Sequence, residues 1–262
     1  MKKHFSYLFA LLTLGLVACT PIDEQERLIE VVPQHTTRAI LLEEFTGQDC
    51  LNCPEASALA HELQKDYGAD KVIVVGLHSG PYGRWPSSRV VGLRTKLADT
   101  YAQHWGVESQ PTALINRRGG LLTRFAWRAA VHEALQTPTS LHLTLRPTAP
   151  TATSPGAVHI DVQSSEAFEG KLQVWLVEDH IVAPQRYPEK VELRYVHQHV
   201  LRAAVNGTWG EDIALQGQQT LSRSYPLSLD PAWQPRHLRI VAFVYHKGGV
   251  EQVATAPLII NP

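Results

Sequence analysis

Two cysteines separated by two residues, Cys50 and Cys53, are the side chains of this 262-residue protein best suited to do chemistry. A thiolate attacks disulfides, and a second thiol nearby can resolve the mixed disulfide that forms. Glu44 lies six residues before the pair. A buried carboxyl at that place would have a raised pKa and could accept or deliver the proton that resolution requires. The spacing of the cysteines therefore predicts a dithiol redox site, in which Glu44 would take part if it is buried. The alternative for Glu44 is a surface carboxylate at the end of a strand.

The two cysteines are expected to have different roles. Cys50, nearer the loop, is expected to be the exposed nucleophile, and Cys53, one helical turn further in, is expected to be the resolving thiol. A helix N-terminus favours the thiolate through its free N–H groups and its dipole. Asp49 opposes thiolate formation, and the sequence leaves open which effect is larger. The alternative is an inert structural disulfide on a redox-type fold.

The elements that must position these residues follow from the apolar pattern. An apolar run over 39–45 predicts a buried strand that ends just before the cysteines. After Pro54, apolar side chains recur at helical spacing as far as Tyr67, and Gly68 marks the end of that helix. The pattern further predicts a strand over 71–78, a helix over 87–105, two strands over 112–116 and 121–125 around Gly119-Gly120, and a helix over 127–136.

This order of strand, cysteine pair, helix, strand, helix, hairpin and helix resembles the thioredoxin fold. Phe45 lies five residues before the first cysteine, as in thioredoxins, and Glu44 takes the place of their buried acid. Gln110-Pro111-Thr112 precedes a strand and resembles the cis-proline loop that faces the cysteines in that fold. The resemblance implies a cis bond before Pro111, with Gln110 and Thr112 in the substrate-facing loop. Two departures are the missing tryptophan before the first cysteine and the inner dipeptide Leu-Asn instead of Gly-Pro.

The N-terminus predicts export and membrane attachment. Lys2 and Lys3 precede an apolar run over 5–18 that is too short to remain as a spanning helix, so it is typical of a signal peptide. Its end, Leu16-Val17-Ala18-Cys19, resembles the lipobox of bacterial lipoproteins, which implies that Cys19 carries a lipid anchor. The alternative is a secreted protein with an ordinary cleavage site. Cysteines in an exported chain favour a disulfide or redox couple over a zinc site.

Composition divides the chain into four parts. Residues 1–18 are the predicted signal peptide, and residues 19–38 are polar, acidic and suited to a tether. A thioredoxin-like domain is predicted over 39–137, and prolines at 138–155 precede a second domain over 138–262.

The charge and the histidines exclude some functions. Loss of residues 1–18 removes two lysines, so the mature charge is 22 − 25 = −3, which gives no polycationic surface for nucleic acid. No cofactor is predicted. A metal site is not favoured, because only one histidine, His78, is expected to lie on the same edge of the sheet as the cysteines. The alternation of His197 and His199 is typical of a half-exposed strand.

The second half is rich in strands. Alternating apolar residues over 141–145 and 158–162, and apolar runs over 172–177 and 238–245, predict an all-β antiparallel sandwich of immunoglobulin-like type. The stretch over 187–212 is less regular, and Tyr195, Arg202 and Trp209 within it are candidates for a binding surface, with packing inside a loop as the alternative.

Five segments together resemble a known family. They are Glu44–Pro54, His78-Ser79-Gly80, Gln110-Pro111-Thr112, His199–Arg202 and Asn206–Gly210. The chain resembles the twenty-eight-kilodalton outer-membrane protein family of Bacteroidetes-type bacteria, which implies an outer-membrane lipoprotein with a thioredoxin-like domain followed by a β domain.

Two functions from different classes follow. The first is a membrane-anchored thiol–disulfide oxidoreductase that acts on exported or envelope proteins. The second is a surface binding protein or adhesin whose β domain contacts a host or envelope partner, while the disulfide only staples the first domain. The direction of redox transfer is not readable from the sequence.

Overall fold

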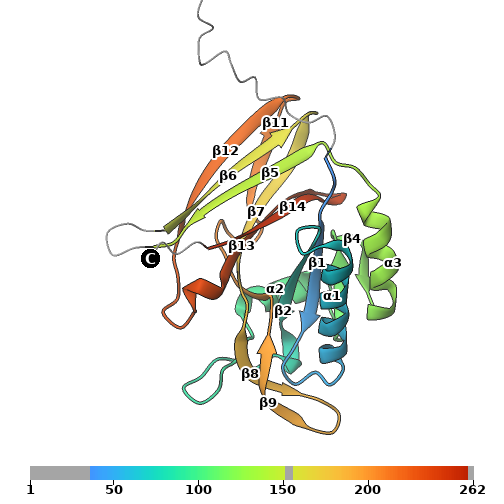
Figure 1. The fold of residues 1–262 in the computed structure, drawn as a ribbon, viewed down its shortest axis with the longest axis vertical. Helices are drawn as coiled ribbons and strands as arrows, with labels where there is room; N and C mark the ends of the chain where they lie inside the picture. Colours follow the sequence, from blue (N-terminus) through green and yellow to red (C-terminus); the bar gives the residue numbers. More distant parts are fainter. Residues whose placement is uncertain (1–35, 151–155, 259–262) are drawn as a thin grey trace, which may run out of the picture. The chain divides into compact units, whose positions relative to one another are not determined.

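The first half of the chain builds a four-stranded part of a larger sheet, with helices on both of its faces (Figure 1). The structure, a computed structural model, describes residues 36–150 and 156–258. The strand order is β2-β1-β3-β4, with β1 parallel to β2 and antiparallel to β3. In chain order the elements are β1 (Ile40–Thr46), α1 (Cys53–Tyr67), β2 (Val72–His78), the short 3-10 turn η2 (Gly80–Tyr82), α2 (Lys96–His104), β3 (Thr112–Ile115), β4 (Arg118–Leu122) and α3 (Arg124–Leu135).

Strand β1 is buried on both faces, which explains its continuous apolar sequence. Leu41 and Phe45 point to the face that α2 covers, in one apolar cluster with Tyr101. Ile40 and Leu42 point to the face that α1 and α3 cover. Glu43 and Glu44 interrupt this pattern, one on each face, and both are buried.

Most predicted elements of this half are confirmed, and two are corrected. The helix predicted over 87–105 spans only 96–104, because the Thr95 side chain caps it by accepting from the Ala98 N–H at 3.0 Å. The hairpin turn is Asn116-Arg117, with φ of 50° and 55°, and Gly119-Gly120 lie inside β4. Gly119-Gly120 is a common hairpin signal and predicted the turn there. A positive φ at an arginine is uncommon, so the pattern gave no sign of a turn at Asn116-Arg117.

The second half consists mainly of antiparallel strands, as predicted. A three-stranded sheet, β12-β6-β5, faces strands β7, β11 and β13 across an apolar core. The elements are β5 (Leu141–Thr148), β6 (Gly156–Ser164), β7 (Phe168–Glu178), β8 (Ile181–Arg186), β9 (Val191–His197), β10 (Val200–Ala204), β11 (Glu211–Leu215), β12 (Gln219–Leu227), the short η3 (Pro235–His237), β13 (Leu238–His246) and β14 (Gly249–Pro257).

One sheet joins the two halves. Strand β10 pairs antiparallel with β7 and meets β2 at Val200 and Gly76, where the Gly76 N–H donates to the His199 carbonyl at 2.7 Å. The order β14-β13-β7-β10-β2-β1-β3-β4 therefore crosses the boundary predicted at 137/138, which falls between α3 and β5. The predicted signal peptide and Cys19 lie outside the described residues.

Candidate functional site

Cys50 and Cys53 form a disulfide between the end of β1 and the start of α1. Their Cα atoms are 5.4 Å apart. Cys53 is the first residue of α1, and Pro54, which has no N–H, occupies a first-turn position where no intrahelical donor is needed. The pair thus lies at the helix N-terminus, as predicted, where free N–H groups favour a thiolate.

The prediction that Cys50 is exposed is wrong for this disulfide form. Cys50 is 3% exposed and Cys53 1%. The cover comes from the β8–β9 hairpin: Gln185 Nε2 donates to the Cys50 carbonyl at 3.0 Å, and the Arg186 N–H donates to the Gln48 carbonyl at 2.8 Å. This hairpin follows Cys50 by more than 130 residues in the sequence, so local periodicity gives no sign of it.

Gln48 ties a second segment to the cysteine turn. Its Oε1 accepts from the Leu93 N–H at 2.9 Å, and its Nε2 donates to the Val91 carbonyl at 3.0 Å. The neighbouring Gly47 packs so tightly that a Cβ there would lie 2.5 Å from the Tyr82 carbonyl carbon. Sequence reasoning did not single out Gln48, although a fully buried glutamine beside the cysteines organises this turn.

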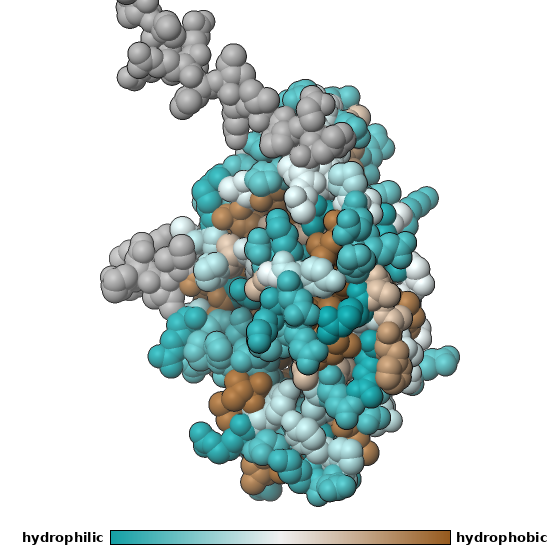
Figure 2. All heavy atoms as spheres, turned by 45° about the vertical axis from the view of Figure 1, so that its right-hand side comes forward, coloured by the Kyte–Doolittle hydropathy of each residue, from teal (hydrophilic) through white to brown (hydrophobic). Residues whose placement is uncertain are grey.

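Large apolar side chains are exposed in the same three segments. Leu51 lies between the cysteines, and most of the others belong to the 82–91 loop and the β8–β9 hairpin. Figure 2 shows apolar patches among hydrophilic surface at the lower end of the molecule, where Figure 1 draws the hairpin. The residues are Leu51, Tyr82, Trp85, Val90, Val91, Val182, Val191, Leu193 and Val196.

Glu44 lies on the face of β1 that α1 covers and is 3% exposed. The Ser57 hydroxyl lies 3.0 and 3.2 Å from its two carboxylate oxygens and donates to them. Among residues 36–150 and 156–258, no cation forms a salt bridge with it. Desolvation raises the pKa of Glu44 to about 7, although hydrogen bonds from Ser57 and Thr46 oppose the shift. Glu44 is therefore not the surface carboxylate that the sequence left as the alternative, and its proton-transfer role stays a prediction.

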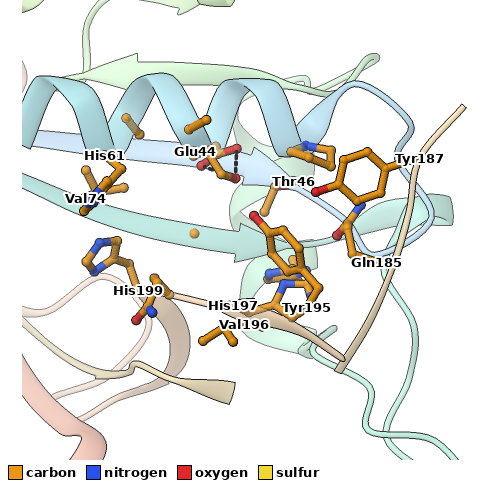
Figure 3. Close-up of a pocket in the computed structure, with 17 residues that line it drawn as sticks. Glu44, Thr46, His61, Val74, Gln185, Tyr187, Tyr195, Val196, His197 and His199 are labelled. Carbon is orange, nitrogen blue, oxygen red and sulfur yellow. Dashed lines mark hydrogen bonds between the residues drawn. The ribbon is translucent and has the colours of Figure 1, made fainter. Parts of the chain in front are cut away.

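A cavity of about 400 Å³ separates Glu44 from strand β9 (Figure 3). Tyr195 and His197 reach it from β9, and His78 reaches it from the end of β2. The rings of His78 and His197 meet edge to face with centroids 5.3 Å apart. Burial lowers the pKa of His197 to about 4 and that of His78 well below its usual range, so both imidazoles are neutral at pH 7.

Asp49 does not oppose a thiolate as an unpaired charge. Arg84 Nε donates to its Oδ2 at 2.8 Å, and this hydrogen bond lowers the pKa of Asp49. The sequence left open whether this carboxylate outweighs the helix end. Because its charge is paired with Arg84, Asp49 opposes a thiolate at the cysteines less than an unpaired carboxylate would.

The predicted proline loop has the expected peptide geometry. The Gln110-Pro111 bond is cis, as predicted. Gln110 Nε2 donates to the carbonyl and the hydroxyl of Ser79, at 3.1 and 3.0 Å. Thr112 begins β3, pairs with Phe45 and donates its hydroxyl to the Leu122 carbonyl at 3.0 Å. Strand pairing thus brings this loop to the end of β1 from which the cysteines follow.

The three residues predicted as a binding surface lie in different places. Tyr195 lines the cavity beside Glu44, and burial raises its pKa to about 12. Arg202 is largely buried, and its Nε donates to Glu178 at 2.7 Å. Trp209 packs against the core cluster around Tyr101. They do not form one surface.

No metal centre is evident in residues 36–150 and 156–258, because no three His, Cys, Asp or Glu side chains there are grouped to hold an ion. His199 instead pairs with Asp179, with Nδ1 3.0 Å from Oδ1. Nor does any helix of these residues combine the length and the apolar character needed to cross a membrane.

Comparison with known structures concerns the fold. The structure of HBP35 of Porphyromonas gingivalis is similar with a TM-score of 0.63 at 14% identity, over 86% of this chain and 80% of that one. A domain of the outer membrane lipoprotein Omp28 from Porphyromonas gingivalis gives a TM-score of 0.31 at 21% identity, over 46% of this chain and 88% of that one. No curated protein gives a significant match.

Comparison with family models identifies the chain. The model described as "Outer membrane protein Omp28" matches residues 98–260. The matched range does not include Cys50 and Cys53, so it carries no information on their chemistry. Because it covers more than half of the 262 residues, the chain belongs to the Omp28 outer membrane protein family, and its location is the outer membrane.

Proposed function

We propose that this protein is a thiol–disulfide exchange protein of the outer membrane, with a thioredoxin-like first domain and an immunoglobulin-like second domain. One observation carries the proposal: the Cys50–Cys53 disulfide closes the N-terminus of α1, and the carboxyl group of Glu44 is buried under the first turns of the same helix, hydrogen-bonded by Ser57 and without a cationic partner in the described part of the chain. A structural staple does not need a buried acid with a pKa of about 7, whereas proton transfer to and from a thiol does.

In the proposed reaction the oxidised pair accepts two electrons from a dithiol. A substrate thiolate attacks the Cys50 sulfur, the Cys50–Cys53 bond breaks, and Cys53 leaves as a thiolate. A second substrate thiolate then attacks the substrate sulfur of the mixed disulfide, which forms a substrate disulfide and releases Cys50 as a thiolate. Glu44 supplies the proton that Cys53 takes up, and it accepts that proton in the reverse direction.

The β8–β9 hairpin must move before a partner can reach Cys50, because both sulfurs are buried. Its hold on the cysteine turn is a small set of hydrogen bonds, chiefly those of Gln185 and the Arg186 N–H. Hydrogen bonds of this kind contribute about 1 kcal/mol each, so breaking those to the cysteine turn costs only a few kcal/mol.

The proposed partners are exported or envelope proteins that expose thiols or disulfides. The apolar side chains around the disulfide, among them Leu51, Trp85 and Leu193, support this, because an incompletely folded chain offers apolar residues beside its free cysteines. The proposed attachment is a lipid on Cys19. A Cys19→Ser variant should then leave the membrane fraction, and unchanged partitioning would exclude the lipid as the main anchor.

The deciding experiment measures the reduction potential of the pair by equilibration with glutathione and alkylation of free thiols. An exchange protein should give a potential above about −300 mV, and Cys53→Ala should accumulate mixed disulfides through Cys50. The double variant Cys50→Ala/Cys53→Ala is the matched control and should trap nothing.

A second candidate function rests on the burial of both sulfurs, which favours a structural disulfide in a surface binding protein or adhesin. In that case the potential should lie below about −300 mV, and the cysteine variants should lose stability without trapping partners.

A further inference from the structure

A second and larger cavity, of about 900 Å³, lies where the end of α2 meets β7, β11 and β13. Trp105, Trp209 and Tyr245 line it, and each of them is only partly buried, so each leaves some of its surface accessible. The Tyr245 hydroxyl donates to the Trp209 carbonyl at 2.7 Å. The cavity is therefore a concave site with aromatic walls, which is the kind of surface that binds small ligands.

The loop that carries Trp209 is held in place by contacts within the protein. The Asn206 side chain accepts from the Val174 N–H at 2.9 Å and donates to the Leu172 carbonyl at 2.8 Å. The ring of Trp209 meets that of Tyr101 edge to face, with centroids 5.0 Å apart. An aromatic wall that is already fixed does not have to be ordered when a ligand binds, which favours affinity.

The charges around the cavity balance one another. Lys171 and Asp212 form an ion pair, with Nζ 2.7 Å from Oδ1. Arg117 is buried and paired with Glu43, whose two carboxylate oxygens each accept at 2.8 Å. Among the described lining residues, two more charged side chains of opposite sign remain, Glu169 and Lys247. The cavity therefore offers no net charge to attract an ion, and an uncharged ligand suits it better.

The rim of the cavity offers accessible hydrogen-bond donors and acceptors side by side. The side chain of Asp212 is 87% exposed and that of Lys171 is 36% exposed. A carboxylate only accepts hydrogen bonds, and an ammonium group only donates them and has donors to spare after one ion pair. A hydroxyl group does both, so it can bridge the two. A ligand with an apolar face and several hydroxyl groups therefore matches both the walls and the rim.

We propose that this cavity binds a neutral carbohydrate. The C–H face of a pyranose ring packs against Trp209 and Tyr245, and hydroxyl groups at the edge of that ring bridge Asp212 and Lys171. A pyranose is uncharged, has an apolar face and carries hydroxyl groups around its edge, so it meets all the requirements of the site. The site is independent of the cysteine pair, because none of its described lining residues belongs to the cysteine turn, α1 or the β8–β9 hairpin.

The test titrates neutral disaccharides into the purified protein and follows binding by saturation-transfer NMR. The probes are cellobiose, maltose, lactose and N,N′-diacetylchitobiose, and at least one of them should bind at millimolar concentration. Asp212→Ala should weaken that binding about tenfold, the value of one hydrogen bond to a charged group. Asp70→Ala is the matched control, because Asp70 is also an exposed carboxylate beside a lysine and lies outside the cavity, so binding should be unchanged.

Trp209→Ala removes an aromatic wall and should abolish binding. Because Trp209 also packs against the core, urea unfolding of this variant reports whether it is folded. Asp212→Ala keeps the test decisive in either case, since a change at so exposed a side chain has little effect on stability. The proposal is overturned if none of the disaccharides binds wild type at millimolar concentration, or if either Asp212→Ala or a folded Trp209→Ala binds the sugar as tightly as wild type.

Discussion

Glu43 and Glu44 are neighbours on β1, are both buried, and point to opposite faces of the sheet. Glu43 lies on the face of α2, in a bidentate ion pair with Arg117 inside an aromatic cluster. Glu44 lies on the face of α1, and its side-chain partner there is the Ser57 hydroxyl. One carboxylate is held as a structural charge. No described residue pairs the other with a cation, and burial raises its pKa to about 7.

The difference shows that burial alone does not decide what an ionisable group does. A buried carboxylate with a matched cation stays charged and contributes to a fixed arrangement, because each charge compensates the desolvation of the other. A buried carboxyl with only a hydroxyl donor becomes easy to protonate near neutral pH. Two residues one peptide bond apart therefore give the molecule a structural face and a titratable face.

The largest expected effect is on the structural face. Arg117→Met leaves Glu43 charged, buried and unpaired, so the free energy of unfolding should fall by about 3–5 kcal/mol. Urea unfolding at pH 7 measures this. The double variant Glu43→Gln/Arg117→Met should recover part of the loss. If Arg117→Met lowered the free energy of unfolding by less than about 1 kcal/mol, the Glu43–Arg117 ion pair would not be important for stability.

The next effect is pH-dependent and concerns Glu44. Its pKa is raised from 4.5 to about 7, so its favourable contribution is complete below pH 4.5 and is lost as pH rises through 7. Glu44→Gln cannot ionise and should be more stable than wild type by about 3 kcal/mol at pH 8, with no gain at pH 4.5.

Unfolding curves from pH 4.5 to 8 check this, with Glu108→Gln at an exposed position as the control. The other titratable groups that face the same cavity are present in both proteins. They are His61, His78, Tyr187, Tyr195, His197 and His199. If Glu44→Gln were more stable than wild type by the same amount at every pH from 4.5 to 8, Glu44 would be charged over the whole range.

A smaller effect is expected where the hairpin covers the disulfide. Gln185→Ala removes hydrogen bonds from the side chain to the carbonyls of Cys50, Gly47 and Arg186. If the conformation in which the hairpin covers the disulfide becomes less stable by about 1 kcal/mol, dithiothreitol should reduce the disulfide about five times faster. The release of free thiols over time measures this rate. Gln198→Ala, just after β9, is the comparison. Equal rates would show that the hairpin does not limit access.

The smallest expected effect is at Arg84, which pairs with Asp49 at the half-exposed rim of the site. Surface ion pairs contribute about 0–1 kcal/mol, so Arg84→Gln should leave the urea midpoint nearly unchanged. The unpaired Asp49 should however raise the pKa of the Cys50 thiol after reduction, measured by the pH dependence of alkylation. A thiol pKa that does not rise would mean that the charge of Asp49 does not reach Cys50.

The sequence by itself determined the local arrangement. The buried strand before the cysteines, the helix that begins at them, and the alternation of the later strands all follow from periods of two and 3.6 residues, which need only neighbours in the chain. Periodicity did not decide whether Glu44 is buried. The resemblance to thioredoxins suggested a buried acid there, and the structure shows that β1 is buried along its whole length.

Only the tertiary structure decided which partners these residues have. Arg117 meets Glu43 across 74 residues of sequence, and Gln185 meets the Cys50 carbonyl across 135. The pairing of β10 with β2 joins the two halves in one sheet. Periodicity predicts that a face is buried, but the residue that covers it depends on how distant segments pack together. Cys50 is therefore covered by a hairpin that its own neighbourhood does not encode.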